Sequence, residues 1–332
     1  RFLLKVIVFI IIQILKKFKR CQARRVMLYL HYILALKELL FMADVTAIIL
    51  TKDEEKNLPD CLKSIQNFAQ RAIVVDSGST DRTCEIAREM GAEVLVHPFE
   101  NYARQFNWGV DAANVQTEWI LRLDADERFP DSLNQKLESV LANPQNADTN
   151  GIMLESDFYF LGRKIRFGGP KKRKIMLYRS GHGRIENRRM DEHTIVDGRV
   201  ISLKERFEHR DFKDLDTFIS KMNWYATREM QDYFEDKNAI QNSAELSDKH
   251  LIALRKKKFG VYYRFPKFLR CRLLFIYNYI FRLGFLDGKE GYVYHWLYQC
   301  WYRTLVDAKI LEQEKFPKPF EKTGALGKTS FD

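Results

Sequence analysis

Short apolar runs alternate with amphipathic segments along the chain after residue 42. Runs rich in β-branched residues predict buried strands at VTAIILT (45–51), AIVVD (72–76) and EWILRL (118–123), and a further strand at EVLV (93–96). Apolar residues at helical spacing lie between these runs, as at Leu58, Leu62 and Ile65. The alternation predicts an α/β fold with a doubly wound, mostly parallel sheet flanked by helices. Ligands of such sheets bind beyond the carboxyl ends of the strands, so the polar residues there are candidates for chemistry.

The period changes beyond residue 150. GIMLESDFYF, KIMLYR and RVISL predict strands of a mixed sheet, and an apolar face from Leu215 to Met230 predicts a long amphipathic helix. Residues 259–302 hold sixteen aromatic residues in forty-four positions, mixed with Arg and Lys. This composition predicts a C-terminal helical region that lies in a membrane interface, although an aromatic core packed on the catalytic domain is the alternative.

These changes in pattern divide the chain into three predicted parts. Residues 1–41 form an N-terminal extension or short anchor, and a fresh domain-like segment begins at Met42. We therefore expect residues 1–41 to be dispensable for chemistry. One domain with the alternating pattern is expected over 42–240. The helical, basic and aromatic region follows over 241–332.

Composition and charge narrow the class of protein. With 46% apolar and 30% charged residues, the 332-residue chain has enough apolar sequence for a sizeable core. The five cysteines are scattered without a C-x-x-C pair, which favours a reduced, cytoplasmic setting. The net charge of +11 is concentrated in residues 1–42 and in a second cluster over 255–272. Two basic regions around a balanced middle indicate an anionic partner such as a membrane surface.

Two acidic motifs follow buried strands. Asp124 and Asp126 lie two residues apart directly after WILRL, and carboxylates so placed can converge on Mg²⁺ or Mn²⁺. Asp76 ends the strand AIVVD, where a carboxylate can accept hydrogen bonds from a nucleobase or ribose. A polar turn with helix caps is the alternative for both motifs.

Four segments in order, AIILTKDEEKNLPDCLKSI, IVVDSGSTDRT, ARQFNWGV and WILRLDADE, resemble the family 2 glycosyltransferases of GT-A fold. Three later segments, GGPKKRKIMLYRSG, MDEHTIVDG and FEHRDFKDLDTFISKMNWYA, are similar to a bacterial branch that builds lipopolysaccharide core and capsular polysaccharide. The resemblance covers residues 44–310 and implies that 42–240 form the catalytic domain, with nucleotide binding in 44–130 and acceptor binding in 150–240. It implies an inverting enzyme that uses a nucleotide-sugar donor and a divalent cation, Mg²⁺ or Mn²⁺.

The resemblance also implies roles for individual residues. The nucleotide-sugar site is assigned to a set at the strand ends and in one helix: Thr51, Asp53, Glu54, Asp76, Ser77, Arg104, Asn107 and Asp124. Many relatives have a second Asp where this chain has Ser77, so the base contact falls to Asp76 or to a hydroxyl. The cation is assigned to Asp126, with Asp124 and His209 as further candidate ligands, and a packed or surface histidine is the alternative for His209.

An acidic pair downstream of the D-x-D supplies the catalytic base. Inverting transfer needs a carboxylate that takes the proton of the acceptor hydroxyl. Aligning the second acid of Asp191-Glu192 with the second acid of the family's pair makes Glu192 the base, and Asp191 is the alternative. The basic, glycine-containing loop 162–174 either clamps a diphosphate or is a solvated run of charge.

Together these features predict a glycosyltransferase that moves a sugar, UDP-linked in the donor, to a lipid-linked saccharide acceptor. We expect it at the cytoplasmic face of the bacterial inner membrane, in lipopolysaccharide or cell-surface polysaccharide biosynthesis. Two alternatives belong to other classes: a catalytically inert membrane scaffold of the same fold, and a basic nucleic-acid-binding protein. The second leaves the acids at the strand ends unexplained.

Overall fold

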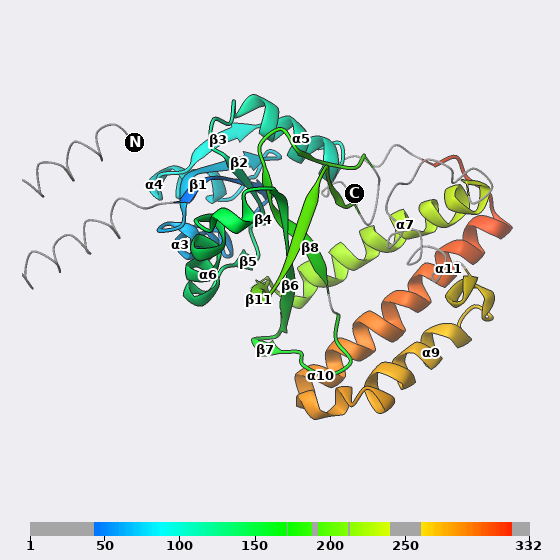
Figure 1. Ribbon diagram of the computed structural model, residues 1–332. Coiled ribbons are helices and arrows are strands. Elements are labelled where there is room, and N and C mark those ends of the chain that lie inside the picture. The colour runs from blue at the N-terminus through cyan, green and yellow to red at the C-terminus, as the bar shows by residue number, and fades with distance from the viewer. Residues whose placement is uncertain (1–42, 171, 188–191, 212, 240–259, 321–332) are drawn as a thin grey trace, which may run out of the picture. The chain divides into compact units, whose positions relative to one another are not determined.

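The computed structural model describes residues 43–170, 172–187, 192–211, 213–239 and 260–320 (Figure 1). The predicted extension over 1–41 and the candidate base Asp191 lie outside the described residues. Ala43–Asp332 form one compact unit.

A single large sheet runs through this unit. In the described residues it has nine strands, in the order β3-β2-β1-β4-β8-β6-β11-β5, with β7 paired to β6. Their bounds are β1 Ala43–Thr51, β2 Ala69–Asp76, β3 Glu93–Val96, β4 Trp119–Asp124, β5 Glu127–Arg128, β6 Thr149–Phe160, β7 Arg163–Lys164, β8 Arg173–Arg179 and β11 Arg199–Arg210. A separate hairpin consists of β9 (Gly183–Ile185) and β10 (Thr194–Val196).

The first half of the sheet is parallel, as predicted. β3, β2, β1 and β4 pair in parallel, with Thr51 opposite Asp76 and Leu50 opposite Asp124. This register brings the carboxyl ends of three strands to one edge of the sheet, where ligands of doubly wound sheets bind.

The second half is mixed, which confirms the prediction for the segments beyond residue 150. β8 is antiparallel to both β4 and β6, and β11 is parallel to β6. The two-residue strand β5 turns back from the D-x-D and pairs antiparallel with β11, placing Glu127 opposite His209. This short pairing joins the D-x-D turn to the far side of the sheet.

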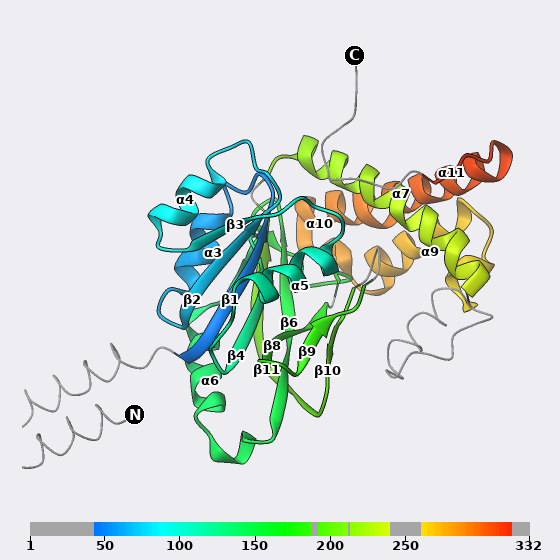
Figure 2. The ribbon, with the colours of Figure 1, turned by 90° about the horizontal axis from the view of Figure 1, so that it is seen from above.

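Helices cover both faces of the sheet (Figure 2). Apolar side chains of α3 (Leu58–Ile65), α4 (Thr83–Glu89) and α6 (Asp131–Leu141) pack on one face, and those of α5 (Tyr102–Ala112) pack on the other. β1 contributes to both cores because its side chains alternate between the faces. α5 approaches closely at Gly109, where an added Cβ would lie 2.5 Å from Val75 Cγ2.

The C-terminal region is helical, as predicted. α7 (Leu215–Ala239) packs against α11 (Tyr302–Lys315) through a core that includes Met222, Met230 and Ile310. α9 (Leu269–Ile276) and α10 (Gly288–His295) complete this layer beside the β6–β11 half of the sheet (Figures 1 and 2). Among the described residues, no helix combines the length and apolarity needed to cross a membrane.

Candidate active site at the carboxyl ends of the strands

Asp76 lies at the centre of a tight turn after β2. Thr51 Oγ1 donates to Asp76 Oδ1 at 2.9 Å, and Ser79 Oγ donates to the same oxygen at 2.5 Å. The backbone N–H groups of Gly78 and Ser79 donate to Oδ2 at 2.8 and 2.7 Å. Gly78 has φ +84°, a conformation that glycine adopts without strain, and this geometry turns both N–H groups toward the carboxylate. A carboxylate has about four acceptor sites, so the turn itself uses the capacity of Asp76.

These contacts set the charge state of Asp76. Burial alone raises the pKa of its carboxyl group, but the hydrogen bonds from Ser79, Thr51 and Gly78 outweigh burial and lower the pKa below its usual value. Asp76 is therefore ionised at neutral pH and fixes the shape of the turn. A nucleobase or ribose contact requires that one of the four donors give way.

Two other residues assigned to the nucleotide, Asp53 and Ser77, lie around this turn. Asp53 has φ +52°, its N–H donates to Ser79 Oγ at 2.8 Å, and its Oδ1 accepts from Thr80 N at 2.8 Å. Ser77 accepts a hydrogen bond from Gln105 Nε2 at 3.3 Å. The structure thus brings Thr51, Asp53, Asp76 and Ser77 together, as the sequence predicted.

Asp124 lies in a network of buried charges. Tyr102 OH donates to Asp124 Oδ1 at 2.5 Å, and Lys174 Nζ donates to Oδ2 at 2.8 Å. Lys174 also donates to Glu127 Oε1 at 2.5 Å, so one ammonium group bridges two acids. Burial raises the pKa of Asp124, but Lys174 and Arg122 lower it well below its usual range. Asp124 is a permanent anion whose two oxygens both have strong donors.

Asp126 differs from Asp124 in its surroundings. Its side chain is buried, and its carboxylate accepts no hydrogen bond from the part of the chain that the structure describes. Asp126 Oδ2 lies 3.6 Å from His209 Nε2 and 3.9 Å from Lys221 Nζ. The pairing of β5 with β11 explains why His209 lies here, eighty-three positions along the chain. Of the two D-x-D acids, Asp126 has the carboxylate with unused acceptor capacity.

Two lysines balance the remaining acids. Lys221 of α7 lies between Asp126 and Asp211, 3.7 Å from Asp211 Oδ2. Lys213 Nζ donates to Glu54 Oε1 at 2.5 Å. Burial, followed by the nearby charge of Asp126, raises the pKa of Glu54 above its usual value despite Lys213. Glu54 therefore belongs to the cluster of acids around Asp126 rather than to the Asp76 turn.

Arg104 and Asn107 lie on α5, away from these acids. Arg104 is exposed and forms an ion pair with Glu100 one turn earlier. Asn107 Nδ2 donates to the carbonyl of Ile185 at 2.8 Å, and the Ile185 N–H donates to Asn107 Oδ1 at 3.1 Å. Asn107 thus pairs with the backbone of β9 as a neighbouring strand would.

Glu192 lies in the loop between β9 and β10, two residues before β10, and is half-buried. The loop is closed by Glu186 and His193: the Glu186 N–H donates to the His193 carbonyl at 3.0 Å, and His193 N donates to Glu186 Oε1 at 3.2 Å. Thr194 at the start of β10 accepts from Arg122 Nη1 at 3.1 Å. Because Arg122 also contacts the Asp124 network through Tyr102 at 3.1 Å, the hairpin of Glu192 is linked to the D-x-D.

Among the described residues, no group of three or more His, Cys, Asp and Glu side chains is arranged to hold a metal ion. Within the described ranges Asp126 and His209 form a pair, and a bound cation would need further ligands. Sequence reasoning missed Lys221 and Arg122, two of the cations beside the acids. It included Lys174 in the basic loop 162–174, assigned to a diphosphate clamp or a solvated run of charge, whereas the structure shows its ammonium group bonded to Asp124 and Glu127.

Comparisons with known proteins agree with this geometry. Residues 46–199 match the family described as Glycosyl transferase family 2. An uncharacterized glycosyltransferase of Rickettsia typhi is 25% identical over 211 residues, which cover 60% of this chain and 72% of that protein. The lipopolysaccharide core biosynthesis glycosyltransferase LpsC of Rhizobium meliloti is 26% identical over 191 residues, 55% of this chain and 69% of that protein.

A solved structure also shows similarity. Glucosyl-3-phosphoglycerate synthase from Mycobacterium tuberculosis, in complex with Mn²⁺, uridine diphosphate and glucosyl-3-phosphoglycerate, is 19% identical with a TM-score of 0.28. The match covers 37% of this chain and 46% of that chain. The matched family, the similar proteins and the acids at the strand ends lead to one conclusion: the chain carries a glycosyltransferase family 2 domain and is a glycosyltransferase.

Proposed function

We propose that the protein transfers a sugar, with inversion, from a UDP-linked donor to a hydroxyl group of a lipid-linked saccharide. We place this reaction in lipopolysaccharide or cell-surface polysaccharide biosynthesis, at the cytoplasmic face of the inner membrane. The observation that carries the proposal is the buried Asp126 carboxylate beside His209 at the end of the parallel strands. The similarity to the core biosynthesis enzyme of Rhizobium meliloti supports the pathway.

Asp126 and His209 fit a divalent cation. A carboxylate oxygen and a ring nitrogen 3.6 Å apart suit two positions of one Mn²⁺ or Mg²⁺ shell, and the donor diphosphate supplies oxygen ligands for others. When bound, such a cation neutralises charge on the departing diphosphate. Lys221 already places a positive charge beside the Asp126 carboxylate, so the protein also stabilises negative charge here with its own residue.

Glu192 is proposed as the base. In the transfer, a carboxylate takes the proton of the acceptor hydroxyl while that oxygen bonds to the anomeric carbon and the sugar–phosphate bond breaks. The half-buried loop position of Glu192, linked to the D-x-D through Arg122, supports this role. Asp191 remains the alternative.

The cation site is tested with Asp126→Asn. We expect the affinity for UDP in the presence of Mn²⁺ to fall by more than roughly tenfold, because loss of a direct ligand exceeds the effect of typical outer-shell changes. Isothermal titration calorimetry with and without Mn²⁺ measures this change. Asp216→Asn, an exposed acid on α7, is the matched control and should bind as the wild type does. Equal affinities of Asp126→Asn and the wild type with Mn²⁺ would remove the proposed site.

The base is tested with Glu192→Gln, which keeps the shape of the side chain but accepts no proton. Turnover, measured as UDP release from the donor that a nucleotide-sugar screen selects, should fall by roughly 10²–10⁴-fold. Affinity for UDP and Mn²⁺ should stay unchanged. Glu205→Gln on β11 is the control. A larger loss in Asp191→Asn would assign the role to Asp191, and normal turnover in both would leave the mechanism without a base.

An exposed apolar surface supports the membrane location. Leu269, Leu273 and Ile276 of α9 are exposed at helical spacing, and Ile280 continues the row. Thirteen exposed large apolar side chains fall within residues 261–296; we call them the apolar patch: Val261, Phe265, Leu269, Leu273, Ile276, Tyr277, Ile280, Phe281, Leu283, Phe285, Leu286, Tyr292 and Trp296. Patches of this kind on a monomer mark interaction surfaces.

The basic residues of this region have two different roles. Arg264 and Arg272 are exposed and can face anionic lipid, each contributing about 1 kcal/mol near a charged leaflet. Arg270 is buried, and its Nε donates to Asp307 Oδ1 at 2.9 Å, so it stabilises the helices instead. The aromatics divide likewise, because Tyr294 and Tyr302 are buried while Phe281 is 74% exposed. The buried aromatics therefore belong to a core packed within the protein, and the exposed ones are available for the proposed contact with a membrane.

A further inference from the structure

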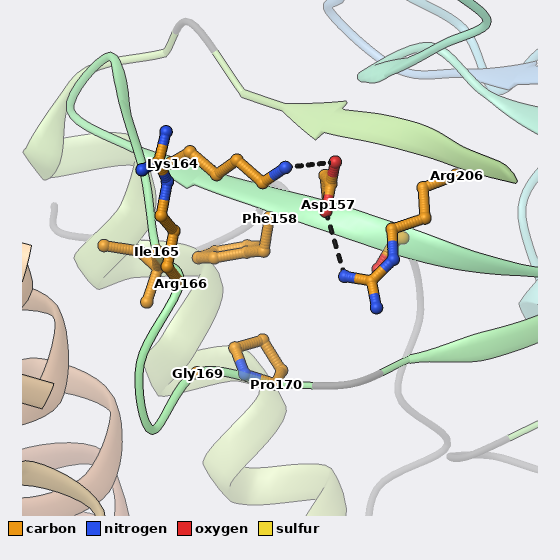
Figure 3. Close-up of a pocket in the computed structure, with 9 residues that line it drawn as sticks. Asp157, Phe158, Lys164, Ile165, Arg166, Gly169, Pro170 and Arg206 are labelled. Carbon is orange, nitrogen blue, oxygen red and sulfur yellow. Dashed lines mark hydrogen bonds and ion pairs between the residues drawn. The ribbon is translucent and has the colours of Figure 1, made fainter. Parts of the chain in front are cut away.

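A polar pocket of about 260 Å³ lies where β6 meets the loop that follows β7 (Figure 3). Its lining combines charged side chains of β6, β7 and β11 with residues of the loop: Ser156, Asp157, Phe158, Lys164, Ile165, Arg166, Gly169, Pro170 and Arg206. None of the residues assigned to the nucleotide, the cation or the base is among them.

The charges that line this pocket do not balance. Asp157 is the only acid among the lining residues; Lys164 Nζ donates to its Oδ2 at 2.5 Å, and Arg206 Nη1 donates to its Oδ1 at 3.2 Å (Figure 3). The Arg166 side chain is exposed and has no ion-pair partner in the described ranges. Three cations against one acid leave an excess of two positive charges.

Glu155 does not cancel this excess. Glu155 lies outside the lining and forms ion pairs with two arginines. Arg206 Nη2 lies 2.5 Å from its Oε1, and Arg173 Nε lies 3.1 Å from its Oε2. Adding this acid and Arg173 to the count leaves the net charge at +2. A diphosphate that joins two groups carries one negative charge on each phosphate, about −2 in all at neutral pH, and matches the excess, whereas a carboxylate or a single linking phosphate offsets half of it. Arginine is also the side chain best suited to phosphate oxygens.

The pocket is connected to the apolar patch on one side and to Asp126 and His209, the candidate cation ligands, on the other. The N–H groups of Arg166 and Phe167 both donate to Asp287 Oδ2 at 2.9 Å, which fastens the pocket loop to the helices that carry the patch. On the other side, the ring of Phe158 lines the pocket and stacks on His209, with centroids 5.4 Å apart. A lipid held by the patch would therefore present its headgroup near this pocket.

We propose that this pocket binds the diphosphate that joins the acceptor saccharide to its lipid, an inference that rests on the proposed function. Arg166 supplies the cation that has no ion-pair partner among the described residues, and Lys164 and Arg206 are held in place by Asp157. The site selects acceptors by their linking diphosphate, separately from the sugar that receives the transfer.

The test uses octyl phosphate below its micelle concentration, with octyl glucoside as a neutral probe of the same chain length. Calorimetry on the full chain should detect octyl phosphate, and Arg166→Gln should weaken its binding by roughly tenfold, the effect of one charge-assisted hydrogen bond. Arg166 is exposed, so this variant keeps the fold. The control is Arg163→Gln, in β7 and outside the pocket lining, which should bind octyl phosphate as the wild type does.

Three results would overturn the proposal. One is equal binding of octyl phosphate to Arg166→Gln and the wild type. Another is octyl glucoside binding as tightly as octyl phosphate. The third is that Arg166→Gln weakens adsorption to phosphatidylglycerol vesicles only, which would assign the charge to membrane lipid in general. UDP and Mn²⁺ titrated into the same samples report on the proposed function separately, because a failed donor site leaves the octyl phosphate result intact.

Discussion

Single carboxylates at the strand ends have different partners, and the partners decide what each can do. Asp76 accepts three hydrogen bonds from its own turn and one from Thr51 of β1, Asp124 is bound by Lys174 and Tyr102, and Asp126 retains acceptor capacity beside His209. Three acids that look alike in the sequence are therefore a turn organiser, a member of a buried charge network and a candidate ligand.

Asp76→Asn tests the first of these roles. The amide places its NH₂ group against donors, so we expect a loss of about 1–3 kcal/mol in the free energy of unfolding. The pKa of Asp76 is lowered in the folded chain, so its stabilisation is fully present above the ordinary value of 3.8 and is lost as the pH falls through the lower folded value. Urea unfolding at pH 7 and at stepwise lower pH should show the difference from the wild type narrowing below 3.8. A pH-independent difference would mean that charge is not involved.

Residue types and order along the chain were sufficient to predict which residues gather at the strand ends. They were not sufficient to predict partners. Lys174 is fifty positions from Asp124, and only the pairing of β8 with β4 and β6 brings it there. Asn107 was assigned to the nucleotide, but the structure shows its amide bonded to the backbone of β9, a contact that requires the hairpin to be in place.

At the scale of elements, β8 carries a cation into a site made by other strands. Lys174 lies near the start of this strand and bridges Asp124 of β4 and Glu127 of β5. Burial acts to lower the pKa of Lys174, but the two acids raise it well above its usual range, so the ammonium group stays charged. The sheet is thus held here by charge as well as by backbone hydrogen bonds.

Lys174→Gln should reveal the size of this contribution. Removing the shared cation leaves Glu127 without its ammonium partner and Asp124 with Arg122 as its remaining nearby cation, and we expect a loss of about 3 kcal/mol in the free energy of unfolding. Chemical denaturation without divalent cations measures it. The control is Lys172→Gln, at an exposed lysine two residues before Lys174, and it should unfold as the wild type does. A loss in the free energy of unfolding no larger than that of the control would show that Asp124 and Glu127 find other partners.

Strands predicted from β-branched runs are present because burial on both faces favours a continuous apolar sequence. β5, β9 and β10 were not predicted, since two or three residues have no period of their own and pair only when a distant strand is in position. These short elements nevertheless carry the D-x-D turn and the Glu192 loop. The sequence therefore predicted the sheet better than the geometry of its site.

At the scale of the whole molecule, the exposed large apolar side chains of the described residues are concentrated in one stretch, 261–296. Leu273→Asp combined with Phe281→Asp should reduce adsorption to phosphatidylglycerol vesicles by more than about tenfold, because each apolar side chain contributes on the order of 1 kcal/mol or more. Flotation of the full chain with vesicles measures the bound fraction. The control is Met90→Asp, at an exposed apolar residue outside the stretch 261–296.

The same flotation should weaken with salt, since part of the attraction is electrostatic. Titration with UDP and Mn²⁺ should be unaffected in the double variant, which separates membrane attachment from the site. Unchanged flotation of the double variant would rule out the apolar patch as the attachment surface.

Asp287 has a consequence for exchanging parts between relatives. This buried carboxylate lies in the C-terminal helices, yet it accepts both N–H groups from the loop after β7, and His295 Nε2 lies 3.1 Å from the carbonyl of Phe167 in the same loop. A chimera that took its C-terminal helices from a protein without an acid at this position would leave two buried amides with no acceptor. Loop and helices are in this respect one inherited part, and a swap that keeps them together is the one we expect to fold.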